Sequence, residues 1–178
     1  FEPKEPAKPS NLPLDVGIVE VVRHTPVWVW GILAAIVVLG ALQMRDHATS
    51  RLRLLAMPLG MGGYSLWGAV SAFGVQAPVL LAWTAGLSIA LVSNARVGWP
   101  GKVRADGDGG FALPGSPLPL LLMLAVFALR YAVTVSLVLH PQWRVEAGFA
   151  LPASIAAGFL AGLFAARARR ILGTSSGG

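Results

Sequence analysis

Residues 117–139 read PLPLLLMLAVFALRYAVTVSLVL, a block whose only charged side chain is that of Arg130. About 20 consecutive apolar residues are enough for a helix to cross about 30 Å of hydrocarbon. Four further blocks of comparable length and composition occur along the chain, at about 26–44, 54–73, 77–93 and 148–166. The sequence therefore predicts an all-α integral membrane protein, a bundle of five transmembrane helices.

The composition excludes an ordinary soluble domain. Of the 178 residues, 55% are hydrophobic and 12% are charged, whereas average soluble domains carry about 25% charged residues. The net charge of +6 does not indicate nucleic-acid binding, because the basic residues stand at the ends of the apolar blocks, where lipid headgroups lie. The expected partner is the lipid bilayer. The absence of cysteine excludes disulfides and thiolate chemistry in this chain.

The basic residues between the blocks predict an orientation. Five spans place the amino-terminal tail, the second-to-third connection and the fourth-to-fifth connection on one side, with Lys4, Lys8, Arg23 and Arg144. The opposite side carries Arg45, Arg51, Arg53, Arg96, Lys102, Arg104, Arg167, Arg169 and Arg170. Because basic residues concentrate on the cytoplasmic side of inner-membrane proteins, we expect a periplasmic amino terminus and a cytoplasmic carboxyl terminus.

The longest polar interval, residues 94–116, is expected to form a hairpin-like cytoplasmic loop between spans three and four. Its DGDGG sequence, at 106–110, supplies the turn residues of a hairpin tip. The flanking sequences KVRA and GFAL are expected to form two strands or extended arms. Residues 1–15 are expected to be a flexible tail, native or introduced by cloning, and residues 171–178 a disordered tail or tag remnant. Residues 16–170 then form the membrane domain.

Arg130 is the candidate binding residue with the clearest physical basis. A guanidinium near the middle of the bilayer costs at least a few kcal/mol, so an arginine retained there indicates a function. No Asp or Glu lies within the other predicted spans, so a buried counter-ion is not evident. We expect Arg130 to bind an anionic small molecule, a lipid headgroup or a carboxylate on a partner subunit. The alternative is that it fixes helix packing by bonding backbone carbonyls and the hydroxyls of Tyr64, Ser65, Ser71 or Thr134.

Two further patterns concern helix packing and binding. Tyr64, Trp67 and Ser71 form a polar-aromatic stripe that is expected either to line a pocket with Arg130 or simply to pack the bundle. Small residues recur at four-residue spacing in the last block, which permits close helix approach inside the bundle or across a homo-oligomer. They form two rows: Ser154, Gly158, Gly162 and Ala166, and Ala153, Ala157, Ala161 and Ala165.

His24 and His140 fall at the outer ends of the first and fourth spans, where two imidazoles on one side could hold a haem iron or a metal. Two histidines without a third ligand match no specific metal template. No metal site or cofactor is therefore predicted, and haem binding stays an alternative. The sequence contains no Walker loop, no HExxH, no GxSxG and no paired carboxylate within a span. A non-enzymatic role is favoured over an enzyme.

Three segments resemble a family of small bacterial inner-membrane proteins of uncharacterised function. They are HTPVWVW at 24–30, the S-x-W-G-x-x-S-x-F pattern at 65–73, and PGS at 114–116 followed by F-x-x-R-Y at 127–131. The resemblance covers most of residues 21–170. It implies a bacterial inner-membrane location, with site residues His24, Tyr64, Trp67 and the pair Arg130–Tyr131. The chain is also distantly similar to accessory membrane proteins of cytochrome c biogenesis.

The sequence thus favours a small inner-membrane binding or accessory protein that recognises an anionic ligand, lipid or partner subunit through Arg130. One alternative is a redox accessory protein that handles haem or another cofactor through His24 and His140. Another is a small homo-oligomeric channel or exporter, in which the small-residue rows form the oligomer and Arg130 sets the anion preference.

Overall fold

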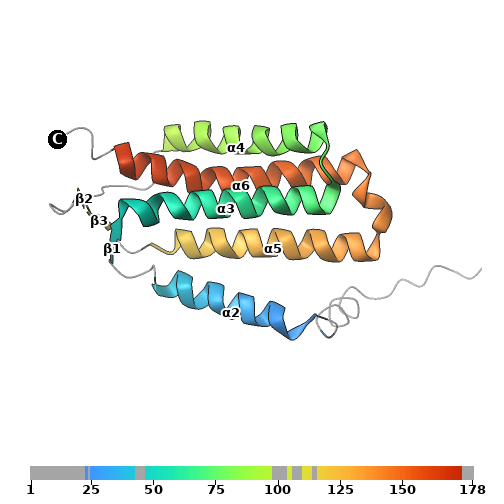
Figure 1. Cartoon of the computed structure of the whole chain (residues 1–178), viewed down its shortest axis with the longest axis horizontal. Coiled ribbons are helices and arrows are strands. Elements are labelled where there is room, and N and C mark those ends of the chain that lie inside the picture. Colours follow the sequence, from blue (N-terminus) through green and yellow to red (C-terminus); the bar gives the residue numbers. More distant parts are fainter. Residues whose placement is uncertain are drawn as a thin grey trace, which may run out of the picture.

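Five long helices and a small sheet make up the part of the chain that the computed structural model describes, which is residues 23, 25–42, 47–97, 104–105, 110–113 and 116–173. Figure 1 shows the long helices side by side, with the sheet at one end of the bundle. In chain order, the elements are α2 (Val27–Leu42), β1 (His47–Ser50), α3 (Arg51–Phe73), α4 (Ala77–Val97), β2 (Arg104–Ala105), β3 (Gly110–Leu113), α5 (Leu118–Leu139), the short 3-10 helix η1 (Pro141–Arg144) and α6 (Ala147–Gly173).

The carboxyl-terminal helix α6 occupies the centre of the bundle. It lies between α4 and α3, with α5 beyond α3 and α2 on the outer edge (Figure 1). A three-residue connection, 74–76, joins α3 to α4, and such short connections usually make two helices direct neighbours. Here α6 separates them along most of their length, and its most extensive contacts are with α4.

Glycines explain why α4 and α6 pack so closely. A methyl group on Gly158 of α6 would overlap the backbone carbonyl of Trp83, and one on Gly86 of α4 would overlap the carbonyl of Ile155. The row of small residues that begins at Ser154 and includes Gly158 is buried against this contact. This row therefore packs inside the bundle, and a homo-oligomer stays a prediction.

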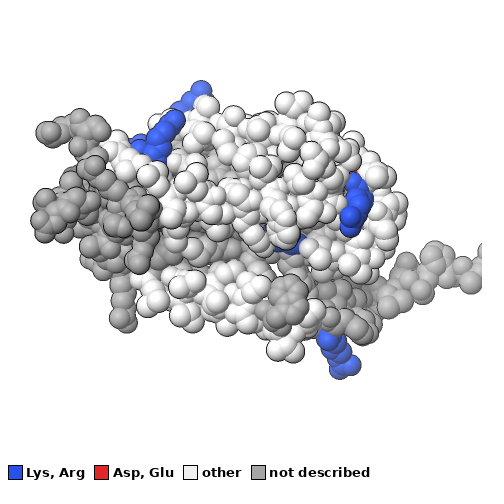
Figure 2. All heavy atoms as spheres, in the orientation of Figure 1, with Lys and Arg blue, Asp and Glu red and all other residues white. Residues whose placement is uncertain are grey.

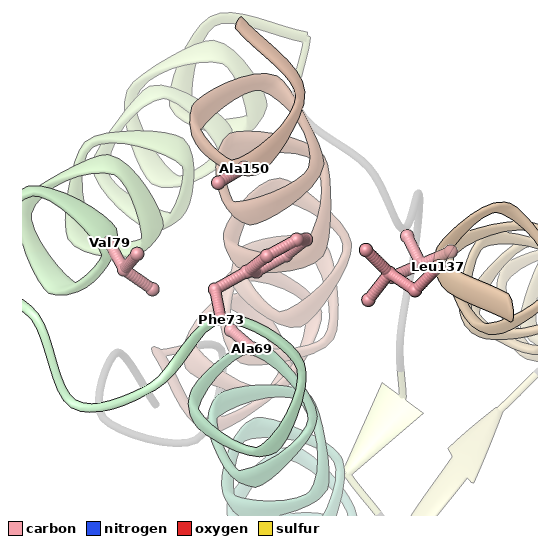
Figure 3. Close-up of a cluster of buried hydrophobic side chains, with 6 residues drawn as sticks. Ala69, Phe73, Val79, Leu137 and Ala150 are labelled. Atoms are coloured by element: carbon pink, nitrogen blue, oxygen red, sulfur yellow. The ribbon is translucent and has the colours of Figure 1, made fainter. Parts of the chain in front are cut away.

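A cluster of apolar side chains fills the bundle near η1. Figure 3 shows Phe73 of α3 pointing into the space between α6 and Leu137 of α5. Phe73 is only 3% exposed, and its ring meets that of Phe149 edge-on, with 6.0 Å between the ring centres. Trp143 of η1 covers Phe149 at 5.0 Å. The connection between α5 and α6 is thus attached to the core by aromatic contacts.

The polar loops form a three-stranded antiparallel sheet at the opposite end from η1. The expected arms pair, since Arg104 lies opposite Ala112 and Ala105 opposite Phe111. The turn residues 106–109 lie outside the described residues. The strand β1, which was not predicted, follows α2 and pairs with the other edge of β3, so the strand order is β1-β3-β2. The connection from α2 to α3 and that from α4 to α5 therefore lie at the same end.

The expected five transmembrane helices are not all supported. Within the described residues, three helices are long and apolar enough to cross a membrane: α4, α5 and α6. α2 is apolar but has 16 residues, which span about 24 Å of a hydrocarbon layer about 30 Å thick. α3 is long enough at 23 residues, but Pro58, its glycines and its two amino-terminal arginines lower its hydropathy.

The helix ends also differ from the predicted blocks, most of all in the last helix. α6 continues to Gly173, beyond the predicted end at 166. Ile171, which was expected in the tail, is fully buried. The end of this span was predicted at 166, before the RARR sequence, because charged side chains mark the edge of the hydrocarbon layer. The helix itself continues beyond the hydrocarbon layer, because its backbone hydrogen bonds join residues of the same helix and form in water as well as in lipid.

Candidate functional site

Arg130 extends from α5 onto α3, where its guanidinium lies over two residues one turn apart. Its Cζ is 5.6 Å from the centre of the Tyr64 ring, within the range of a cation–π interaction. The guanidinium also rests on Gly68, where an added Cβ would come within 2.5 Å of Nη1. Gly68 therefore provides the space in which the arginine side chain crosses α3, and Tyr64 supplies its aromatic contact.

The guanidinium borders a cleft of about 190 Å³ between α3, α5 and η1. Arg144 of η1 lines the same cleft, as do Ser71 of α3 and Thr134 of α5. Four apolar residues complete the wall: Ala72, Val133, Leu137 and Val138. Two cations and two hydroxyl side chains thus converge on one small, half-open space at the η1 end of the bundle.

Among the described residues, no acidic side chain lines the cleft to offset the two arginines. Glu146 is the one acidic residue that the structure describes, and it does not line the cleft. In the described part of the chain, the Tyr64 ring is the only side-chain partner recorded for the Arg130 guanidinium. A guanidinium has five N–H donors, so Arg130 can donate hydrogen bonds to an incoming oxyanion.

The hydroxyls that could have bonded Arg130 are partly committed elsewhere. Ser65 donates to the carbonyl of Ala157, at 2.8 Å, and accepts from the indole Nε1 of Trp83, at 3.1 Å. Ser71 donates to the carbonyl of Gly68 on its own helix, at 3.1 Å. Behind the guanidinium is a second cavity of about 20 Å³, large enough for about one water molecule. None of these hydrogen bonds involves Arg130, and the alternative that Arg130 only fixes helix packing stays a prediction.

The structure separates two of the predicted site residues from this cleft. Tyr131 faces α2, where its hydroxyl shares a 2.6 Å hydrogen bond with Thr25 and its ring stacks on Phe127. Trp67 is 63% exposed and lines neither cavity beside Arg130. Residues 64, 67 and 71 do have the spacing of a helical stripe. The Arg130 side chain, however, crosses α3 at Gly68, away from Trp67.

The histidines give no metal site in the described residues. His24 lies outside those residues. His140 is exposed and stacks on Trp143, with 4.3 Å between the ring centres, as an interfacial aromatic anchor would. No group of three or more potential ligands is found among the described His, Cys, Asp and Glu side chains.

A family model described as a family of unknown function (DUF6622) matches residues 14–176. The chain belongs to this family. The match agrees with the resemblance to an uncharacterised family drawn from the sequence. No curated protein and no solved structure matches the chain, so the distant similarity to cytochrome c biogenesis accessory proteins stays a prediction.

Arg144 is the one polar residue lining the cleft in this DUF6622 protein that was predicted neither as a site residue nor as a partner of Arg130. It was counted only as a loop charge on the amino-terminal side of the bundle. Two features of the sequence place it near Arg130: the short connection between α5 and α6, and the aromatic residue Trp143 beside it, which attaches η1 to the core. Arg144 comes near Arg130 only in the folded bundle, whereas the sequence indicates only which charges lie within a span.

Proposed function

We propose that this DUF6622 protein is a membrane-embedded, non-enzymatic binding or accessory protein that holds an anionic group between Arg130 and Arg144. The observation that carries the proposal is the cleft itself: a guanidinium with only an aromatic ring as its described side-chain partner borders a space that also presents a second arginine. The group it takes is an oxyanion, either a carboxylate or a phosphate, from a free solute or a lipid headgroup.

The chemistry of the cleft suits an oxyanion. Arginine binds carboxylates and phosphates through pairs of parallel N–H···O bonds, which are roughly twice as strong as bonds between neutral groups. The hydroxyl of Thr134, which also lines the cleft, adds a donor for one of the remaining oxygens. An anion also lowers the cost of holding Arg130 at membrane depth, because it neutralises a charge that lipid cannot solvate.

Tyr64 and Gly68 give the guanidinium a defined position before the ligand arrives. The ring of Tyr64 restrains the cation from one side, and the bare backbone at Gly68 allows it to lie close to α3. A restrained side chain loses less conformational entropy when it binds. The two residues are therefore positioning residues for Arg130 in this proposal.

The proposal includes the membrane topology. All five long helices lie in a bacterial inner membrane, with the amino terminus in the periplasm. α3 lies between α6 and α5, which are both apolar enough to span, and α2 exposes apolar residues such as Val38 and Leu39, at 59% and 56%. The cleft at the η1 end then opens towards the periplasm, and the sheet faces the cytoplasm.

Orientation can be tested directly, because the chain has no cysteine. Single cysteines are introduced at Gln142 in η1 and at Gly173 at the end of α6, and intact cells are treated with a membrane-impermeant maleimide. We expect Gln142→Cys to be labelled in intact cells and Gly173→Cys to be labelled only after lysis. The opposite pattern, or equal labelling of both, would overturn the proposed topology.

The binding test uses purified full-length protein in mild detergent and three probes: inorganic phosphate, succinate and phosphatidylglycerol. We expect at least one probe to bind, and Arg130→Gln and Arg144→Gln each to weaken it at least about tenfold, equivalent to about 1.4 kcal/mol. Arg170→Gln, an exposed cation on α6 outside the cleft, is the matched control and should bind as the unmodified protein does. Binding of phosphate or succinate indicates a free solute, and phosphatidylglycerol binding that both Arg130→Gln and Arg144→Gln weaken indicates a headgroup in the cleft.

Two results contradict this proposal. One is that none of the three probes binds. The other is that both cleft variants keep the affinity of the unmodified protein while Arg170→Gln lowers it. Thermal unfolding of each variant, followed in the same detergent, separates a lost binding site from a lost fold.

A further inference from the structure

A second, larger hollow lies on the other half of the bundle, away from the Arg130 cleft. It has a volume of about 570 Å³, within the range of ligand pockets. Its walls come from the amino-terminal half of α3, the middle of α4 and the carboxyl-terminal half of α6. All of its lining residues are uncharged except Arg169. We call it the α3–α6 groove.

The glycines of α3 create the groove. Gly62 and Gly63 line it, and a Cβ added to either would meet no atom within 4 Å. Trp83 of α4 forms part of the facing wall. The same glycines lowered the hydropathy of α3, so the feature that makes this helix a poor candidate span also opens the space beside it.

The length of the groove matches one leaflet of a bilayer. On α3 its lining runs from Leu55 to Leu66, a helical rise of about 17 Å. Half of a hydrocarbon layer about 30 Å thick is about 15 Å. The groove therefore reaches from the end of the bundle that carries the sheet to about the middle of the membrane.

Positive charge stands at the open end of the groove. Arg169 lies in the last turns of α6 and lines the groove, and Arg170 and Arg96 are also exposed on the same end of the bundle. Figure 2 shows the basic side chains of one face mostly near the two ends, with a broad uncharged surface between them. An apolar groove one leaflet long that ends in exposed arginines is complementary to an anionic phospholipid, whose acyl chain is apolar and whose phosphate is negative.

We propose that the α3–α6 groove binds one acyl chain of an anionic phospholipid from the leaflet at the sheet end, with Arg169 on its phosphate. Apolar burial alone does not favour this lipid, because the chain is equally apolar in the bilayer. Preference comes from Arg169 and from the close fit of the chain beside Gly62 and Gly63. The inference is independent of the Arg130 cleft, which lies at the opposite end of the bundle.

The test is native mass spectrometry of the full chain in mild detergent, titrated with phosphatidylglycerol or with phosphatidylcholine of the same acyl chains. Gly62→Leu and Gly63→Leu add a side chain at the groove, at positions where an added Cβ meets no atom within 4 Å. Gly60→Leu is the matched control, because Gly60 stands on the same helix, also has open space around its Cβ, and does not line the groove. Arg169→Gln removes the charge and leaves the apolar walls.

We expect the unmodified protein to retain one phosphatidylglycerol in preference to phosphatidylcholine. Gly62→Leu and Gly63→Leu should lower its retention at least about fivefold, Gly60→Leu should leave it unchanged, and Arg169→Gln should abolish the preference between the two lipids. Equal retention by all the glycine variants would overturn the proposal. So would a dimer that the two groove-filling variants convert to monomers, because the groove would then hold a second copy of the chain. Arg130→Gln should not change this lipid, which separates a failure here from a failure at the cleft.

Discussion

The backbone carbonyl of Trp83 on α4 lies against Gly158 of α6, with no room for a side chain between them. Because the obstacle is backbone, an added methyl must push two helices apart. We expect Gly158→Ala to lower the free energy of unfolding by about 1–3 kcal/mol, the usual cost of overpacking. The measurement is a denaturant titration in detergent. Gly60→Ala, where the added methyl meets open space, should be neutral or slightly stabilising, and equal destabilisation of the two variants would contradict the close contact.

Gly68→Ala should affect binding more than stability. The added Cβ would come within 2.5 Å of Nη1 of Arg130, but the end of a long side chain can move away at low cost. We therefore expect the unfolding free energy to change little and the affinity for the anion that binds the cleft to fall severalfold. An affinity equal to that of Gly60→Ala would show that Gly68 does not position the guanidinium for binding.

Ser65→Ala should weaken the attachment between three helices. The hydroxyl accepts from Trp83 of α4 and donates to the carbonyl of Ala157 on α6, and the residue is only 5% exposed. Its removal leaves buried groups without these bonds, at a cost of about 1–3 kcal/mol. Ser88→Ala on α4, which removes an exposed hydroxyl bonded to its own helix, is the control and should change stability by less than about 0.5 kcal/mol.

Tyr131→Phe should loosen the start of α2. The phenolic hydroxyl shares a hydrogen bond with Thr25, 106 positions earlier in the chain, and α2 is the outermost helix. We expect a loss of about 0.5–1.5 kcal/mol, together with faster amide hydrogen exchange in the first turns of α2. Exchange in α4 and α6 should stay unchanged. Faster exchange spread evenly over all helices would mean that the hydroxyl stabilises the whole bundle rather than this one contact.

Hydropathy predicted the positions of the helices well but not their neighbours. The apolar block at 117–139 became α5 almost residue for residue, because helix length in lipid is set by span. Which helices touch depends on where two backbones can approach, and that depends on glycines such as Gly86 and Gly158 on different helices. One sequence gives no means of matching these glycines, so the central place of α6 was not predicted. The pairing of β1 with β3 was also missed, because one sequence does not show which distant segments pair.

The candidate site was predicted in its principal residue and missed in its surroundings. Charge in an apolar block singles out Arg130 without any structure. Helical spacing then grouped Tyr64, Trp67 and Ser71, although spacing alone does not say on which side an arginine from another helix arrives. Arg144 was not predicted as a site residue, because residues in a connection follow no periodicity that would indicate which helix they contact. The membrane count of five rested on the composition of α2 and α3, but α2 is short and the glycines and Pro58 of α3 lower its hydropathy.

The three-stranded sheet has a consequence for the order in which the chain can assemble. Ser50 of β1 pairs with Gly110 of β3, sixty residues later, so β1 leaves the ribosome long before its partner exists. Closing a loop of that length costs roughly 3–4 kcal/mol of chain entropy, which the intervening α3 and α4 must offset by being in place first. The sheet can therefore join the first half of the chain to the second only after β3 has been made, whereas α6, which packs between α3 and α4, is made later still.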